Sequence, residues 1–105
     1  MNTPLSARLR AQCDGPRDGA LLRFSLGNAL LAEGDAAAAV AELQRALEFD
    51  GNYSAAWKLL GKACLADADP DAASDAWQRG IEVARQRGDK QAEKEMAVFL
   101  RRLRG

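Results

Sequence analysis

The sequence predicts an all-α domain of about six helices and no strands. Apolar residues recur at spacings of three and four through most of the chain, which is the periodicity of helices that bury one face. β-Branched residues are few, and no segment alternates apolar and polar residues as a half-buried strand does. Two successive stretches of 34 residues also match each other, as helical repeats do. At 105 residues the chain is expected to form a single domain, residues 1–105.

The first expected helix covers about residues 4–13. Thr3 is placed to be its N-cap, and Pro4 suits the first helical turn because its φ angle is already fixed. The apolar stripe of this helix consists of Leu5, Leu9 and Cys13. The segment Asp14-Gly15-Pro16 then separates this helix from the rest of the chain.

Five further helices are expected at about 19–33, 36–49, 53–67, 70–87 and 89–103. Turn and capping residues set their boundaries, and the sharpest signal is Asp69 as an N-cap followed by Pro70. The other breaks lie at Gly34-Asp35, Asp50-Gly51-Asn52 and Gly88-Asp89. The apolar stripes, in chain order, are Leu22, Leu26, Ala29 and Leu30; Val40, Leu43, Ala46 and Leu47; Trp57, Leu60 and Cys64; Ala73, Trp77, Gly80 and Ile81; Ala92, Met96, Phe99, Leu100 and Leu103.

An internal repeat becomes visible when the sequence is shifted by 34 residues. About eleven positions are then identical, against the two to four that chance would give in so alanine-rich a chain. Gly27 falls on Gly61, and both lie inside expected helices, where glycine costs about 1 kcal/mol relative to alanine. We interpret them as points where a neighbouring helix comes very close, with Leu43 and Trp77 filling the space beside the small residues of that helix. The four consecutive alanines from 36 to 39 then belong to a packing helix rather than to low-complexity filler.

The period and the residue pattern together resemble the tetratricopeptide repeat family. The first copy, residues 20–53, matches that family's pattern at Leu26, Gly27, Leu30, Ala39, Leu43 and Ala46, and the second, residues 54–87, at Trp57, Leu60, Gly61, Cys64, Ala73 and Trp77. At Gly80 of the second copy, glycine replaces a small helix-favouring alanine. Arg23 stands where the family has tryptophan, and Gly51 replaces its terminal proline. The resemblance implies a right-handed α-α superhelix of helix-turn-helix repeats, with residues 4–19 as an N-terminal half-repeat and linker and 89–103 as a capping helix.

The resemblance also implies a non-catalytic interaction module that holds a peptide or partner segment in a concave groove. The residues that it places in the groove are Leu21, Phe24, Asn28, Leu31, Lys58, Lys62 and Leu65. On this reading the two lysines face an acidic group or a C-terminal carboxylate, and Phe24 and Leu31 take an apolar side chain. The alternative is that Phe24 packs on the N-terminal helix and the lysines are an ordinary solvated face. The two-carboxylate clamp of one family subgroup is broken here, because Asn28 matches it but Phe24, Leu59 and Asp89 do not.

Several other functions are disfavoured by composition. The chain has no histidine, and no nucleophile–base pair can be assembled, so we expect neither an enzyme nor a cofactor. The acids from Asp67 to Asp75 lack the glycine and the final glutamate of a calcium loop, so no metal site is expected. No apolar run could span a membrane or act as a secretory signal, and the two widely spaced cysteines indicate reduced thiols in a cytoplasmic protein.

Two further interpretations concern partners. The net charge is zero, but residues 79–105 are basic, so contact with nucleic acid through the last helix is a remote alternative, which Glu93 and Glu95 interrupt. Self-association, as a homodimer through the groove or a cap face, is the nearer alternative. The alanine- and arginine-rich composition suggests a bacterial source.

Overall fold

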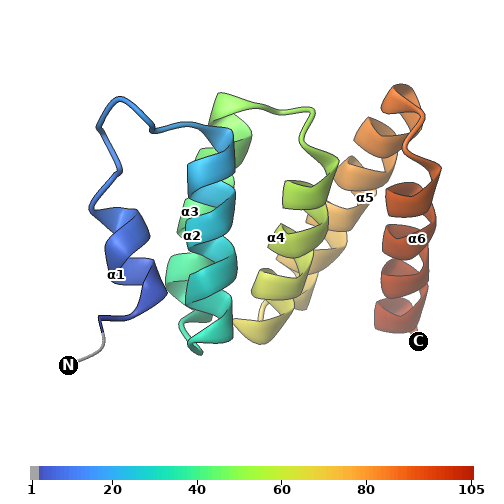
Figure 1. The fold of residues 1–105 in the computed structure, drawn as a ribbon. Coiled ribbons are helices and arrows are strands. Elements are labelled where there is room, and N and C mark those ends of the chain that lie inside the picture. Colours follow the sequence, from blue (N-terminus) through green and yellow to red (C-terminus); the bar gives the residue numbers. More distant parts are fainter. Residues whose placement is uncertain (1–2) are drawn as a thin grey trace.

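The computed structural model describes residues 3–105, and residues 1 and 2 of the expected domain lie outside this range. It contains six helices: α1 (Leu5–Arg10), α2 (Ala20–Ala32), α3 (Ala36–Phe49), α4 (Ser54–Ala66), α5 (Pro70–Arg87) and α6 (Lys90–Arg104) (Figure 1). Residues 3–105 form no strand. The all-α prediction is therefore confirmed, and the five longer helices begin and end within about two residues of the expected positions.

The helices form two layers that curve together. Each helix packs on the next one in the sequence, with α2 in front of α3 and α4 in front of α5 (Figure 1). Helix α4 also contacts α2 and α6, whereas α3 and α5 do not contact each other in the part of the chain described. The layer of α2, α4 and α6 is thus on the inner side of the curve, which we call the concave face. Helices α3 and α5 form the opposite side, the convex face.

The core is closed where small residues of one helix meet large residues of the next. A Cβ atom built on Gly61 would lie 2.1 Å from Nε1 of Trp77, and one built on Gly27 would lie 2.7 Å from Cγ of Leu43. The Trp77 indole is held in place because its Nε1 donates to the carbonyl oxygen of Lys58 at 3.1 Å. The expected close approach at both glycines is confirmed, and the largest fully buried side chains of the core are Leu26, Leu43 and Met96.

Three aspartates cap helices in the same way. The carboxylates of Asp35, Asp69 and Asp89 each accept a hydrogen bond from the backbone amide three residues later, at 3.1 to 3.2 Å. Asp89 also accepts from the Ser54 hydroxyl at 2.7 Å, which fastens α6 to α4. Together these hydrogen bonds, first that from Ser54, hold the pKa of Asp89 below its ordinary value.

The first helix was predicted wrongly in two respects. Its N-cap is Pro4 without a side-chain hydrogen bond, not Thr3, and the helix ends at Arg10 rather than at Cys13. The amides of Gln12 and Cys13 bond to the carbonyl groups three residues before them, so the chain tightens into turns instead of continuing the helix. Leu5 is half exposed, and only Leu9 and Cys13 of the expected stripe pack on the core.

One position in the second repeat carries backbone strain that the first repeat avoids. Ala68 has φ of 59°, in the left-handed region, whereas the matching position of the first repeat is Gly34 with φ of 87°. A left-handed conformation costs an alanine roughly 1–2 kcal/mol, and a glycine avoids this cost. Part of the resulting stabilisation is offset because glycine increases the conformational entropy of the unfolded chain.

We therefore expect Ala68→Gly to raise the free energy of unfolding by about 0.5–1 kcal/mol, measured by urea denaturation followed by circular dichroism. The matched control is Ala66→Gly, at the last residue of α4, which should lower it by up to about 1 kcal/mol. A destabilised Ala68→Gly protein would show that the turn is not strained.

Candidate functional site

The predicted groove residues of α2 lie along one side of that helix. Leu21 is 69% exposed and Asn28 is exposed, whereas Phe24 and Leu31 are half-buried. The Phe24 ring stacks on Tyr53, with ring centroids 5.0 Å apart, at the entrance to α4. Leu21 and Asn28, rather than Phe24, are therefore the most accessible predicted side chains on α2.

The two predicted lysines of α4 differ in their surroundings. Lys58 is half-buried, and its Nζ lies 3.3 Å from Oε1 of Glu95 on α6. Lys62 is exposed, and its Nζ lies 4.9 Å from the centroid of the Phe99 ring, in cation–π geometry. Lys62 has no carboxylate within ion-pair distance among residues 3–105, so its charge, unlike that of Lys58, is available to a ligand.

A pocket of about 400 Å³ opens beside Lys62, between α4 and α6. We call it the α4–α6 pocket, and it is lined by Lys62, Leu65, Trp77, Phe99, Arg102 and Leu103. Leu65 is 44% exposed, and the Trp77 and Phe99 rings pack at a tilt with centroids 5.4 Å apart. Arg102 is exposed and forms no ion pair within the described residues. The pocket thus combines apolar walls with two cations whose charges are unmatched, an arrangement suited to an anionic group attached to an apolar one.

Phe99, Arg102 and Leu103 were missed as site residues by the sequence reasoning, which treated 89–103 only as a cap. The repeat register of the sequence could have indicated that α6 contributes to the concave face. Because α6 follows α5 as α4 follows α3, α6 takes the place of the first helix of a further unit, and its side chains reach the concave face. The amphipathic pattern of this helix was read as one buried stripe, although Phe99 and Leu103 are only half-buried.

Arg23, where the family has tryptophan, forms a buried cluster of charges. Its guanidinium donates to both carboxylate oxygens of Asp18 at 2.8 and 2.9 Å and to Oε1 of Glu42 at 2.8 Å. The hydrogen bond from Arg23 holds the pKa of Asp18 far below its ordinary value. The hydrogen bonds to Asp18 and Glu42 in turn raise the pKa of Arg23, although burial of the guanidinium acts in the opposite direction. The cluster ties the linker before α2 to α3, so its role is structural.

Two other kinds of feature are absent from residues 3–105. None of their helices combines the length and the apolar character that crossing a bilayer requires. Across residues 3–105, histidine, cysteine, aspartate and glutamate side chains form no group of three that could hold a metal ion.

Comparison with known proteins places these features in a family. The sequence pattern of the tetratricopeptide repeat matches residues 30–94. TPR repeat-containing protein PA0015 of Pseudomonas aeruginosa strain PAO1 is 57% identical over 86 residues, which cover 82% of each chain. The solution structure of protein BPP2914 from Bordetella parapertussis is 43% identical, with a TM-score of 0.83, over 98% of this chain and 89% of that one.

A more distant solved structure agrees with these. The tetratricopeptide repeat domain protein from Salinibacter ruber is 28% identical, with a TM-score of 0.76, over 86% of this chain and 90% of that one. Proteins built from such repeats are in general non-enzymatic modules for protein–protein interaction. The helical pairs, the glycine-mediated packing and these likenesses lead to one conclusion: this chain belongs to the tetratricopeptide repeat family.

Proposed function

We propose that this chain is a non-catalytic adaptor that binds the C-terminal segment of a partner protein on its concave face. The observation that carries the proposal is the α4–α6 pocket, where Lys62 and Arg102 border apolar walls and have no carboxylate partner in the described chain. A peptide terminus with an apolar last residue supplies both complements at once. Its carboxylate pairs with the two cations, and its side chain covers Leu65, Phe99 and Leu103.

The ion pairs within the protein favour Lys62 and Arg102, rather than Lys58 and Lys62, as the residues that bind the ligand carboxylate. The sequence suggested that Lys58 and Lys62 share one carboxylate, but Lys58 already has Glu95 at 3.3 Å. A ligand carboxylate at Lys58 would lie close to that like charge, which is unfavourable. Lys62 and Arg102 have no such competitor, so we assign the carboxylate to them.

The rest of the partner segment is proposed to run from the pocket across α4 towards α2. The exposed side chains on this path include the Asn28 amide, which can both donate to and accept from a peptide backbone, and Leu21, which offers an apolar contact. A face of three helices contacts few ligand residues, so we expect modest affinity for an isolated peptide and tighter binding of a whole partner.

The test begins with random octapeptides displayed with free C-termini, from which binders are selected against the wild-type chain. The selected peptide should bind the Lys62→Glu/Arg102→Glu double variant at least 10-fold more weakly by calorimetry, because two attractive charges become repulsive. Amidation of the C-terminus should weaken binding to the wild type in the same direction.

The matched control is Lys90→Glu/Lys94→Glu, which changes the net charge by the same amount at two positions of α6 outside the α4–α6 pocket. This control should bind the peptide within about 3-fold of the wild type if long-range charge effects are screened by salt. Equal affinity of the pocket variant and the wild type would refute the assignment of the site.

A further inference from the structure

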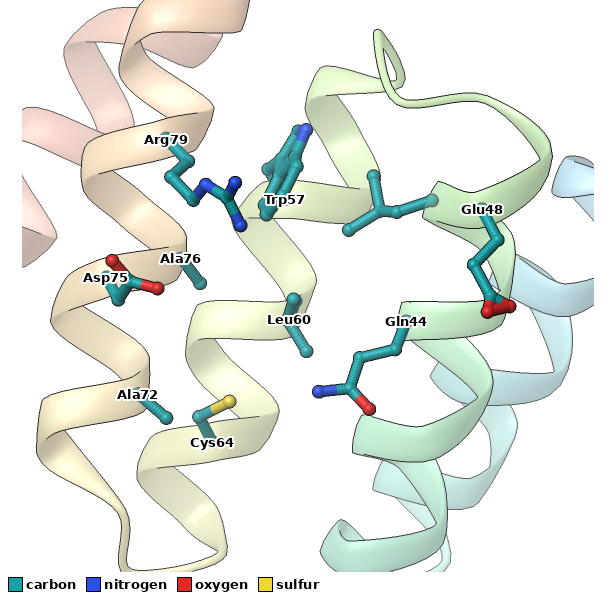
Figure 2. Close-up of a pocket in the computed structure, with 10 residues that line it drawn as sticks. Gln44, Glu48, Trp57, Leu60, Cys64, Ala72, Asp75, Ala76 and Arg79 are labelled. Atoms are coloured by element: carbon teal, nitrogen blue, oxygen red, sulfur yellow. The ribbon is translucent and has the colours of Figure 1, made fainter.

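A second hollow lies on the convex face, opposite the α4–α6 pocket. The backbones of α3 and α5 do not approach each other closely, and a cleft of about 310 Å³ opens between these helices, with α4 as its floor (Figure 2). The floor consists of Trp57, Leu60 and Cys64. The walls add Leu47 from α3 and the methyl groups of Ala72 and Ala76 from α5. We call this hollow the convex cleft.

The Trp57 part of the floor of the convex cleft is fixed by contacts within the protein. The Trp57 indole Nε1 donates to the carbonyl oxygen of Gly51 at 2.9 Å, and the Arg79 guanidinium lies over the Trp57 ring, 5.5 Å from its centroid (Figure 2). A side chain that enters the cleft therefore meets an aromatic surface that is already in position, and little ordering remains to be done on binding.

The polar rim of the convex cleft has unused binding capacity. Gln44 and Glu48 border it on α3, and Asp75 and Arg79 on α5. Within residues 3–105 the Gln44 amide and the Asp75 carboxylate take part in no side-chain hydrogen bond or ion pair. A ligand that supplies a cation and hydrogen-bond donors satisfies groups that the fold leaves free.

The charge of this face is opposite to that of the α4–α6 pocket. On α3 and the first three turns of α5, three exposed carboxylates stand against two guanidinium groups: Glu48, Asp71 and Asp75 against Arg45 and Arg79. Asp71 and Asp75 are one helical turn apart on the same side of α5, and neither forms an ion pair in the described chain. Such a surface attracts basic segments and repels acidic ones.

We propose that the convex cleft is a second docking site, which takes one large apolar side chain from a lysine- or arginine-rich segment of a partner. Its volume is at the lower end of the range for ligand pockets, which suits a single side chain rather than a whole helix. The surrounding carboxylates pair with the basic residues on either side of that anchor. The inference is independent of the peptide proposed for the concave face, because the two sites select ligands of opposite charge.

The probe is the peptide Lys-Lys-Phe-Lys-Lys, acetylated at its N-terminus and amidated at its C-terminus so that it has no terminal carboxylate. Added to the ¹⁵N-labelled protein, it should shift the amide signals of Leu47, Leu60, Cys64 and Ala76 and the Trp57 indole signal in NMR spectra. Replacing the phenylalanine of the peptide with glycine should weaken binding at least 5-fold, because the apolar anchor is lost.

The protein variant Asp75→Lys reverses one exposed charge at the rim and should weaken binding at least 5-fold without altering the circular dichroism spectrum. Asp67→Lys, which changes the net charge equally at an exposed position outside the cleft, should bind as the wild type does. The proposal is overturned if the glycine peptide binds equally, if Asp75→Lys has no effect, or if the shifts occur in the α4–α6 pocket. It is also overturned if the cleft signals shift with protein concentration alone, because a second copy of the chain would then occupy the cleft.

Discussion

Replacing Gly61 with alanine is expected to lower the free energy of unfolding by about 2–4 kcal/mol. The new methyl group would lie 2.1 Å from Nε1 and 2.3 Å from Cε2 of Trp77, which is far inside van der Waals contact. Trp77 is 3% exposed, so its ring cannot move aside without losing packing and its hydrogen bond to the carbonyl of Lys58. The better helix propensity of alanine returns only about 1 kcal/mol. Urea denaturation followed by circular dichroism measures the difference.

Two other glycines provide graded comparisons. Beyond its chain neighbours, a methyl group on Gly51 would come no closer than 3.8 Å to any heavy atom, so Gly51→Ala should change stability by less than about 0.5 kcal/mol. On Gly27 it would meet the flexible Leu43 side chain at 2.7 Å, which can shift at less expense than an indole, so an intermediate loss is expected. If the Gly61→Ala variant were as stable as the Gly51→Ala variant, this would contradict the close approach of α4 and α5 at Gly61.

Arg23→Met is expected to destabilise the fold by about 3 kcal/mol, because it leaves Asp18 and Glu42 without their shared cation in a buried position. The side chain of Arg23 is only 10% exposed, so water cannot replace its five donors fully. Urea denaturation followed by circular dichroism measures this loss. The variant should also lose the contacts that hold the linker before α2.

The control for this prediction is Arg45→Met. The Arg45–Glu48 pair is exposed and belongs to one helix, so its loss should cost less than about 0.5 kcal/mol. The triple variant Arg23→Met/Asp18→Asn/Glu42→Gln should recover part of the stability, because the stranded charges are removed together with their partner. A loss for Arg23→Met no larger than that for Arg45→Met would contradict a structural role of the cluster.

The fold was predictable from the sequence because its determinants are local or periodic. Asp35 and Asp69 cap their helices 34 residues apart, and Gly27 and Gly61 mark the same close contact in each repeat. The end of α1 was not predictable in this way. This short helix has no capping side chain, and its last expected turn is replaced by tighter turns that lead to Asp14, at φ of 65°.

The candidate site was predictable only in part. The family resemblance implied that Lys62 and Leu65 lie on the inner side of α4, and both line the α4–α6 pocket. The pairing of Lys58 with Glu95, 37 residues away, depends on how α6 lies against α4, and the stacking of Phe24 on Tyr53 depends on the path of a turn. The Arg23 cluster draws Asp18 from an irregular linker, where no periodicity marks it. These contacts are tertiary, and a pattern along one helix does not contain them.

The proposed function requires the C-terminus of a partner to lie in the α4–α6 pocket. The most direct test is NMR of the complex with the selected free-acid octapeptide, with nuclear Overhauser effects measured between the side chain of its last residue and the protein. We expect contacts from that side chain to the Phe99 ring and to the methyl groups of Leu65 and Leu103. Contacts instead to Leu47 and Trp57 on the convex face, or to none of the pocket residues, would contradict it.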